Sequence, residues 1–153
     1  MFDRQTVLSD LRSMTQTNIS LHKTEIPVLW SQMDANGHVN NGIFQFYFDE
    51  ARMVALEAEG FSIAEMRANQ IGPVIHKAEI EYHKPLTHPN TAIVETTFGE
   101  ASKARGKVYQ NIYRSTDGAL VCKAVFQALF FDFKINRPWR LPDFFVNKYS
   151  ATP

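Results

Sequence analysis

The sequence predicts an α+β fold in which one antiparallel sheet of about five strands wraps around a single long helix. Residues 44–58 place apolar side chains at helical spacing, and the chain after residue 74 reads as strands separated by short turns. Short turns join antiparallel neighbours, and a lone amphipathic helix must bury its apolar face against the sheet. The 153 residues suit one compact domain: we assign residues 1–20 to an N-terminal arm or short helix and residues 21–153 to that domain.

The first strand is expected at residues 24–30, where Ile, Val and Trp follow one another closely. Pro27 has no N–H to donate to a neighbouring strand, so this strand belongs at a sheet edge or at a bulge. Residues 31–42 follow as a loop, because Asp, Asn and Gly residues that favour turns are concentrated there.

The long helix begins after this loop and has the strongest pattern in the chain. Its polar side carries several acids and Arg52, for which a surface or interface ion pair is expected. Asn40 or Asn41 is positioned to cap its first turn, and Gly60 suits the position just past its end. Its apolar side consists of Phe44, Tyr47, Phe48, Ala51, Val54, Ala55 and Ala58.

Four strands are expected after the helix. The pair Asp117-Gly118 marks a hairpin between the last two, because these residues tolerate the positive φ of tight turns. The final strand is so apolar that its middle requires cover on both faces. Residues 137–142 close the fold as an extended tail. The four strands are predicted at residues 74–83, 91–98, 107–114 and 119–133.

Composition and charge argue against several classes of function. Sixteen basic and sixteen acidic residues give a net charge of zero, which argues against a broad nucleic-acid surface. Cys122 is the single cysteine, so a disulfide within the chain is impossible, and its apolar setting indicates an inert buried thiol. No apolar run reaches the roughly 20 residues of a membrane span, and residues 1–20 lack the apolar segment of a signal peptide. We therefore expect a cytoplasmic protein that contacts no membrane.

The histidines do not have the spacing of a metal site. His76, His83 and His88 form no compact group with Asp, Glu or Cys. His76 and His83 are separated by an odd number of residues, which places them on opposite sides of a regular strand. We expect neither a metal nor a cofactor.

The most informative stretch is Asp-Ala-Asn-Gly-His-Val-Asn-Asn at residues 34–41, which leads into Phe44 and Tyr47 of the helix. Further motifs follow it in order: Glu-Tyr-His-Lys-Pro at residues 81–85, the Asp-Gly hairpin, and Arg-Pro and Leu-Pro pairs within residues 137–142. Together they resemble the 4-hydroxybenzoyl-CoA thioesterase-like family of hotdog-fold acyl-CoA thioesterases. The resemblance covers residues 24–142 and implies a sheet wrapped around a central helix. It also implies hydrolysis of an acyl-CoA thioester to a carboxylic acid and CoA.

The same resemblance implies that Asp34 is catalytic and that the backbone N–H of Asn41 polarises the thioester carbonyl. General chemistry agrees, because thioester hydrolysis needs an oxygen nucleophile, or a base that makes one from water. A helix start also offers unpaired N–H groups to a developing oxyanion. Asp34 as nucleophile and Asp34 as general base both stay open. His38 is a further catalytic candidate, which orients Asp34, contacts substrate or bonds across an interface.

Candidate substrate-binding residues come from the helix start and from a basic turn. Asn40 is one of them, although a cap or loop clamp explains it equally well. Phe44 and Tyr47 are candidates for the wall of an acyl tunnel, and core packing is the alternative. Lys103 and Arg105 flank a predicted turn and are the first choice for the phosphates of CoA, although solvated turn charges are just as common.

Other functions compete with the acyl-CoA thioesterase. An acyl-acyl-carrier-protein thioesterase shares its chemistry, and a basic patch near the tunnel mouth would indicate it. A non-catalytic acyl-binding hotdog module is a third possibility, against which Asp34 and its loop argue. Hotdog dehydratases carry a histidine-glycine-proline pattern that this loop lacks. Because the sheet has an outer face and edges to cover, we expect a homodimer or a dimer of dimers with active sites at the subunit interface.

Overall fold

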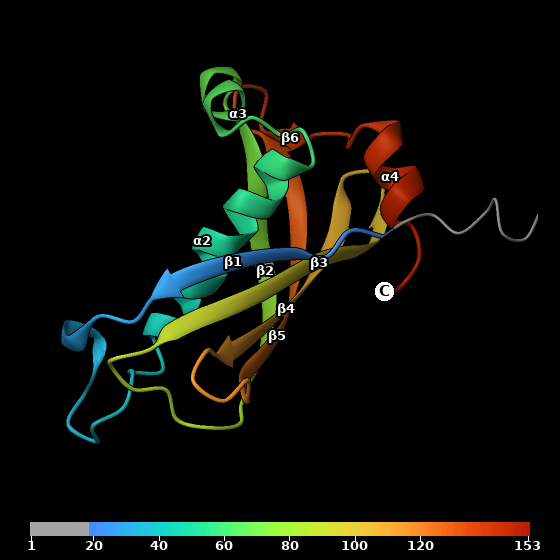
Figure 1. The fold of residues 1–153 in the computed structure, drawn as a ribbon. Helices are drawn as coiled ribbons and strands as arrows, with labels where there is room; N and C mark the ends of the chain where they lie inside the picture. The colour runs from blue at the N-terminus through green and yellow to red at the C-terminus, as the bar shows by residue number, and fades with distance from the viewer. Residues whose placement is uncertain (1–18) are drawn as a thin grey trace, which may run out of the picture.

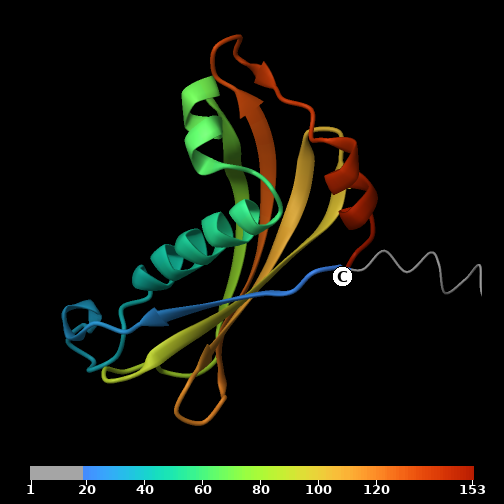
Figure 2. The ribbon, with the colours of Figure 1, turned by 45° about the horizontal axis from the view of Figure 1, so that its top comes forward.

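The computed structural model describes residues 19–153, so the predicted arm at residues 1–20 lies almost wholly outside the described residues. Within that range a six-stranded antiparallel sheet curls around the long helix α2 (Ile43–Ala58), as Figures 1 and 2 show. This arrangement confirms the predicted α+β class. The other elements are β1 (His22–Pro27), the 3-10 helix η1 (Trp30–Gln32), α3 (Ile63–Asn69), β2 (Ile71–Tyr82), β3 (Thr91–Ser102), β4 (Arg105–Arg114), β5 (Leu120–Asp132), β6 (Arg137–Pro138) and α4 (Asp143–Tyr149).

The strands follow one another across the sheet in the order β1-β3-β4-β5-β2, and β6 adds a short pairing to β5. β1 is an edge strand that pairs with β3, as Pro27 predicts, and Pro27 lies opposite Thr91. β2 forms the other edge and pairs with β5. The predicted Asp117-Gly118 hairpin joins β4 to β5, and Gly118 has a φ of +67°.

The core lies between α2 and the concave face of the sheet. Phe48 and Ala51 have no exposed surface, and the Phe48 ring packs edge-on against Phe126 of β5 with centroids 5.4 Å apart. Burying one such aromatic side chain contributes roughly 1.5–3 kcal/mol to the free energy of folding. Val54 and Ala58, predicted on the apolar side, are exposed, because they lie beside the part of the helix that the sheet covers.

Arg52 does not lie on the solvent side as predicted, because α2 buries it inside the sheet with 4% of its surface exposed. Its guanidinium pairs with Asp49, donates to Gln110 Oε1 at 3.2 Å and lies 4.6 Å from the centroid of the Phe126 ring. Gln110 in turn donates to Thr96 Oγ1 at 2.9 Å. The buried charge is tolerated because each polar neighbour has a partner.

Several boundaries differ from the prediction. Residues 30–32 form a 3-10 helix instead of extending the first strand, since Gln32 Oε1 accepts the N–H of Leu29 at 2.9 Å and turns the chain. β2 begins three residues earlier than predicted, and β3 continues to Ser102. α3 and α4 were not predicted: each has seven residues, too few to show a helical period. The expected tail at residues 137–142 contains β6 and leads directly into α4.

A buried carboxylate fastens α4 to the rest of the fold. Glu59 is the residue that directly follows α2, and its side chain is 5% exposed. Its carboxylate accepts hydrogen bonds from the Tyr149 hydroxyl and from Lys148 Nζ, the latter at 2.9 Å. His22 Nε2 of β1 lies 2.7 Å from Glu59 Oε1. Burial by itself would raise the pKa of Glu59, but the bonds from Tyr149, Lys148 and His22 outweigh it and lower the pKa below its usual 4.5.

Glu59→Gln is expected to destabilise the fold by about 1–3 kcal/mol at pH 7, because it removes the charge that Lys148 and Tyr149 bond. The folded pKa is lower than the unfolded one, so this stabilisation is complete above the usual 4.5 and disappears as pH falls through the folded pKa. Urea unfolding of both proteins between pH 7 and pH 3 tests this expectation. The difference in the free energy of unfolding between the two proteins should disappear in acid. The control Glu25→Gln, at an exposed position, should match the wild type at every pH. A difference in the free energy of unfolding that does not change with pH would show that the charge of Glu59 does not stabilise the fold.

Candidate active site

The loop between β1 and α2 holds Asp34 in a tight turn. Met33 and Val39 form an isolated antiparallel bridge, and the N–H of Asp34 donates to His38 O at 2.9 Å. Gly37 closes the turn with a φ of +74°, a conformation that glycine adopts without steric cost. Asp34 itself is half-buried. Its position is therefore set by the backbone on both sides of the turn.

Two groups hold the Asp34 carboxylate. Oδ1 accepts the N–H of Asn36 at 2.9 Å, and Oδ2 accepts Asn40 Nδ2 at 3.3 Å. The Asn40 side chain also accepts the N–H of Gly42 through Oδ1 at 2.9 Å. Asn40 thus links the carboxylate directly to the start of α2, in the manner of the predicted loop clamp.

Helix α2 begins with free N–H groups close to this carboxylate. Gly42 is the N-cap residue, so the prediction that Asn40 or Asn41 occupies that position is wrong, although Asn40 still bonds the first turn from two residues before it. The N–H of Asn41 has no hydrogen-bond acceptor among residues 19–153. An N–H group of this kind at a helix N-terminus can bind an oxygen that carries partial negative charge.

A cleft of about 250 Å³ opens beside the helix start, between the loop and the end of β2. His38 and Asn41 line it from the loop, and Phe44 forms part of its apolar wall. Tyr82 of β2 also lines the cleft. Its hydroxyl donates to Asn41 O at 3.3 Å, and its ring packs edge-on against Phe44 with the ring centroids 5.6 Å apart. The remaining lining residues are Val39, His83, Lys84, Pro85 and Leu86.

The structure separates the predicted substrate-binding residues into three places. Asn40 bonds Asp34, and Phe44 lines the cleft at the start of α2. Tyr47 is buried on the side of α2 that faces β1, where its hydroxyl donates to Gln32 Oε1 at 2.6 Å, and burial raises its pKa to about 12. Lys103 and Arg105 lie at the turn between β3 and β4, at the opposite end of these strands from the Asp34 loop (Figure 1).

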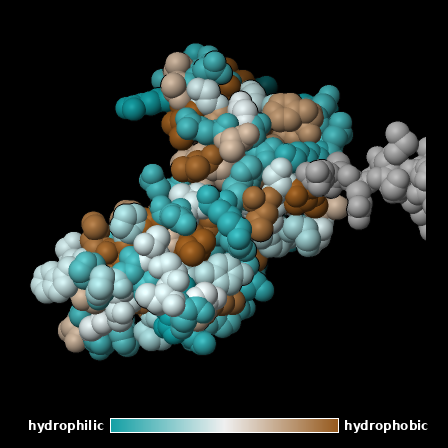
Figure 3. Space-filling model, viewed as in Figure 1, coloured by the Kyte–Doolittle hydropathy of each residue, from teal (hydrophilic) through white to brown (hydrophobic). Residues whose placement is uncertain are grey.

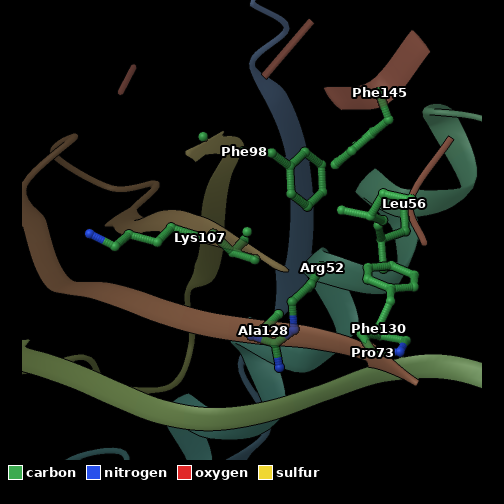
Figure 4. Close-up of a pocket in the computed structure, with 12 residues that line it drawn as sticks. Arg52, Leu56, Pro73, Phe98, Lys107, Ala128, Phe130 and Phe145 are labelled. Carbon is green, nitrogen blue, oxygen red and sulfur yellow. The ribbon is translucent and has the colours of Figure 1, made fainter. Parts of the chain in front are cut away.

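The described residues pack closely in the interior under α2. One apolar cavity lies under the C-terminal half of the helix, where Figure 4 shows Phe98, Phe130 and Phe145 around it. Its volume of about 20 Å³ is roughly that of one water molecule and is too small for an acyl chain. Phe44 and Phe48 fill the space nearer the site.

Two residues of the cleft were not predicted as parts of a site with Asp34. Tyr82 and Lys84 both belong to the motif at residues 81–85, which entered the sequence analysis only as part of the resemblance. Lys84 has no carboxylate within ion-pair distance in the described part of the chain, whereas Lys107 pairs with Glu100 at 2.8 Å. The signal that could have identified them is the Tyr-His-Lys-Pro run at the end of a predicted strand.

Neither cysteine nor metal chemistry is indicated for this cleft. Cys122 is fully buried, and burial raises the pKa of its thiol to about 12. Residues 19–153 contain no group of three His, Cys, Asp or Glu side chains that could hold a metal ion. The same residues form no helix that is long and apolar enough to cross a membrane.

The amino-acid sequence matches one family of proteins over most of its length. The sequence pattern of the thioesterase-like superfamily matches residues 28–149. A candidate esterase of Aquifex aeolicus is 33% identical over 76 residues, which are half of this chain and 59% of the length of that protein. The match therefore spans less than two thirds of this curated relative.

Solved structures share the fold. A candidate thioesterase from Pseudomonas aeruginosa, PA2801, has a TM-score of 0.74 at 28% identity and covers 82% of this chain and 96% of its own. The 1,4-dihydroxy-2-naphthoyl-CoA thioesterase of Synechocystis has a TM-score of 0.74 at 18% identity, covering 84% and 96%. These neighbours confirm the predicted hotdog fold.

Asn40→Ala is expected to loosen the loop, because it removes one partner of Asp34 and the acceptor of the Gly42 N–H. The amide of Gly42 should exchange with solvent faster, and global stability should fall by about 1 kcal/mol. Amide hydrogen exchange by NMR measures the first effect and urea unfolding the second. Asn41→Ala is the matched control, because its side chain bonds nothing in the described residues. Unchanged amide exchange at Gly42 in Asn40→Ala would show that the Asn40 side chain does not stabilise the loop.

Proposed function

Because the chain belongs to the thioesterase-like superfamily, we propose that it hydrolyses acyl-CoA thioesters at the junction of the Asp34 loop and α2. One observation carries this proposal. The Asp34 carboxylate, held by Asn36 and Asn40, is joined through Asn40 to a helix start whose Asn41 N–H is unpaired, and His38 and Asn41 of the same loop line a cleft open to solvent. The carboxylate supplies or activates the nucleophile, and the N–H group stabilises the oxyanion.

The reaction proceeds by one of two routes with the same products. In the first, Asp34 attacks the thioester carbonyl, the C–S bond breaks, and CoA leaves as the thiolate. Water then hydrolyses the resulting anhydride and restores the carboxylate. In the second, Asp34 removes a proton from water and the resulting hydroxide attacks the carbonyl directly. The C–S bond then breaks, CoA leaves as the thiolate, and the proton held by Asp34 passes to it and restores the carboxylate. In both routes the Asn41 N–H donates to the carbonyl oxygen as it gains negative charge.

Asn40 and His38 have supporting parts in this proposal. Asn40 orients the carboxylate through Oδ2 and leaves Oδ1 bonded to the Asn36 backbone. His38 lines the cleft from the same turn and contacts the bound thioester. Phe44 provides apolar surface next to the reacting carbonyl.

The chain works as a homodimer in this proposal, with β2 as the interface. β2 has 12 residues, forms a sheet edge, and is exposed over most of its length. A long unpaired edge is a template for another strand, and a second copy of β2 is a matching partner. A dimer of dimers built on this unit is compatible with the exposed apolar residues of the outer α2 surface, among them Phe46 at 67%.

The CoA nucleotide is assigned to basic residues near the cleft. Lys84 lines the cleft and is free to bind phosphate. Lys103 and Arg105 of the second copy would lie at the same end of the extended sheet as Asp34, because antiparallel pairing of β2 reverses the strands. Acyl-CoA is preferred to acyl-acyl-carrier protein as the substrate because a solved structure with the same fold, that of Synechocystis, is named as the thioesterase of a CoA thioester.

Asp34→Asn is expected to lower kcat on acyl-CoA by at least about 1,000-fold, because it removes the carboxylate but keeps its size. Free-thiol release from short, medium, long and aromatic acyl-CoAs measures the rate, and circular dichroism verifies that the variant is folded. Asp132→Asn, at the last residue of β5 and so at the opposite end of that strand from the cleft, is the matched control and should retain full activity. Full activity of Asp34→Asn would refute the assignment. Trapping by hydroxylamine of an acyl-enzyme would favour the anhydride route.

Lys84→Ala is expected to raise KM for acyl-CoA about 10-fold and leave KM for the matching acyl-pantetheine unchanged, because only CoA carries the nucleotide phosphates. Lys103→Ala and Arg105→Ala are expected to give smaller effects in the same direction. Lys134→Ala, in the exposed β5–β6 turn, is the control. Equal changes for both substrates would show that Lys84 does not contact the nucleotide.

A further inference from the structure

A tyrosine joins the end of β2 to the start of α2. The Tyr82 hydroxyl donates to Asn41 O at 3.3 Å, and the Tyr82 ring packs edge-on against Phe44. The backbone of Tyr82 is fixed, because it pairs with Cys122 of β5, which has no exposed surface. A carbonyl oxygen can only accept a hydrogen bond, so the tyrosine is the donor. Tyr82 therefore presents an O–H group from a paired strand to the loop that carries Asp34.

Hydrogen bonds continue from this carbonyl to the Asp34 carboxylate. Asn41 O and the Gly42 N–H belong to one peptide group, and that N–H donates to Asn40 Oδ1 at 2.9 Å. Nδ2 of the same Asn40 amide donates to Asp34 Oδ2 at 3.3 Å. We call this the Tyr82 series: the Tyr82 hydroxyl, the Asn41–Gly42 peptide, the Asn40 side-chain amide and the Asp34 carboxylate.

All bonds of the Tyr82 series run in the same direction. The Gly42 N–H can only donate and an ionised carboxylate can only accept, so one orientation of the Asn40 amide satisfies both. A donor at the carbonyl of an amide polarises the N–H of that amide, and bonds in such a series strengthen one another. The Tyr82 hydroxyl is thus the first donor of a series that ends on the proposed catalytic carboxylate.

The same series bears on the Asn41 N–H, which the proposed function assigns to the oxyanion. This N–H shares a peptide group with Asn40 O, which accepts the N–H of Ile43 at 2.9 Å. The next peptide group, between Asn41 and Gly42, is held by Tyr82 on its carbonyl and by Asn40 on its N–H. Both peptide groups around the Cα of Asn41 are therefore fixed, and so is the direction in which the free N–H points.

We infer that Tyr82 is a positioning residue of the proposed reaction, whose hydroxyl holds the Asn41–Gly42 peptide and, through Asn40, the Asp34 carboxylate. This inference rests on the proposed function. Figure 3 shows mainly hydrophilic and intermediate residues on the visible surface at the loop end of the molecule, so water competes for the bonds of the loop. Tyr82 counters this competition from a strand 41 residues further along the chain.

A second connection keeps the loop in place when the hydroxyl is removed. The N–H of Val39 donates to Leu86 O at 2.8 Å, which joins the loop to the segment after β2 independently of any side chain. Loss of the Tyr82 hydroxyl should therefore change the orientation of the Asn41–Gly42 peptide and leave the fold intact.

Tyr82→Phe removes the hydroxyl and keeps the ring against Phe44. It is expected to lower kcat on acyl-CoA about 5-fold and to leave KM near the wild-type value, because the Tyr82 series acts on groups that meet the transition state and the cleft wall is retained. Tyr113→Phe is the matched control. Tyr113 follows the buried Ile112 in β4, so it faces away from α2, and its hydroxyl accepts Asn111 Nδ2 at 3.5 Å.

NMR supplies a readout that does not depend on activity. In Tyr82→Phe the Gly42 amide should exchange with solvent about 3-fold faster, and the Asn40 side-chain amide protons should shift upfield, because both lose a polarising donor. A double-mutant cycle then tests the series. Asn40→Ala removes its middle member, so adding Tyr82→Phe to Asn40→Ala should lower kcat by less than about 2-fold further, where independent effects would multiply.

The outcomes separate the inference from the proposed function. A lower kcat at constant KM, the two NMR changes and a double variant that is less impaired than the product of the single effects support the inference. Wild-type kcat in Tyr82→Phe, a change confined to KM, unchanged NMR signals or a fully multiplicative double variant would each overturn it and leave the proposed function standing. Absence of hydrolysis by the wild type on every acyl-CoA overturns the proposed function and this inference with it.

Discussion

Burial of the apolar stripe of α2 in the concave face of the sheet is the constraint on which the rest of the structure depends. One helix and one sheet make up the main core, so the sheet must curl until β1 and β2 flank the helix. That curvature brings the end of β2 beside the first turn of α2, and Tyr82 meets Phe44 there. It also leaves β2 as a long exposed edge. The location of the cleft and the exposure of the β2 edge both follow from the same packing.

Hydrogen-bonded polar side chains inside this core stabilise the buried charge of Arg52, on the side of α2 that packs against the sheet. Arg52 reaches Gln110, and Gln110 bonds both Thr96 and the carbonyl of Phe48, at 2.9 and 3.0 Å. The chain of bonds ties α2 to β3 and β4 at fixed register, because every donor and acceptor would be costly to leave unpaired. At the end of α2, Glu59 ties the helix to α4 in a similar way. The helix is thereby held along its length, which fixes the direction of its N-terminus toward the Asp34 loop.

The site divides into a rigid half and an open half. Asp34 and the start of α2 are fixed by short-range hydrogen bonds through Asn36 and Asn40. The surfaces that would hold an acyl group and a nucleotide lie instead along the exposed β2 edge and the hairpin turn of Lys103. A second copy on that edge would join them.

Local features could be predicted from the sequence, and features made by distant contacts could not. The apolar stripe of α2, the Asp117-Gly118 hairpin and the Asp34 turn are each encoded within a few neighbouring residues, so periodicity and turn chemistry were enough. The seven residues of α3 and of α4 carry no such period. The burial of Arg52, the meeting of Asn41 with Tyr82 and the distance of Lys103 from Asp34 depend on how the sheet curls. Strand pairing at long range decides that curl, and residues far apart in the chain leave no mark on each other's local pattern. The sequence by itself therefore determined the helix, the hairpin and the candidate carboxylate, and the tertiary structure alone decided which other residues lie around that carboxylate.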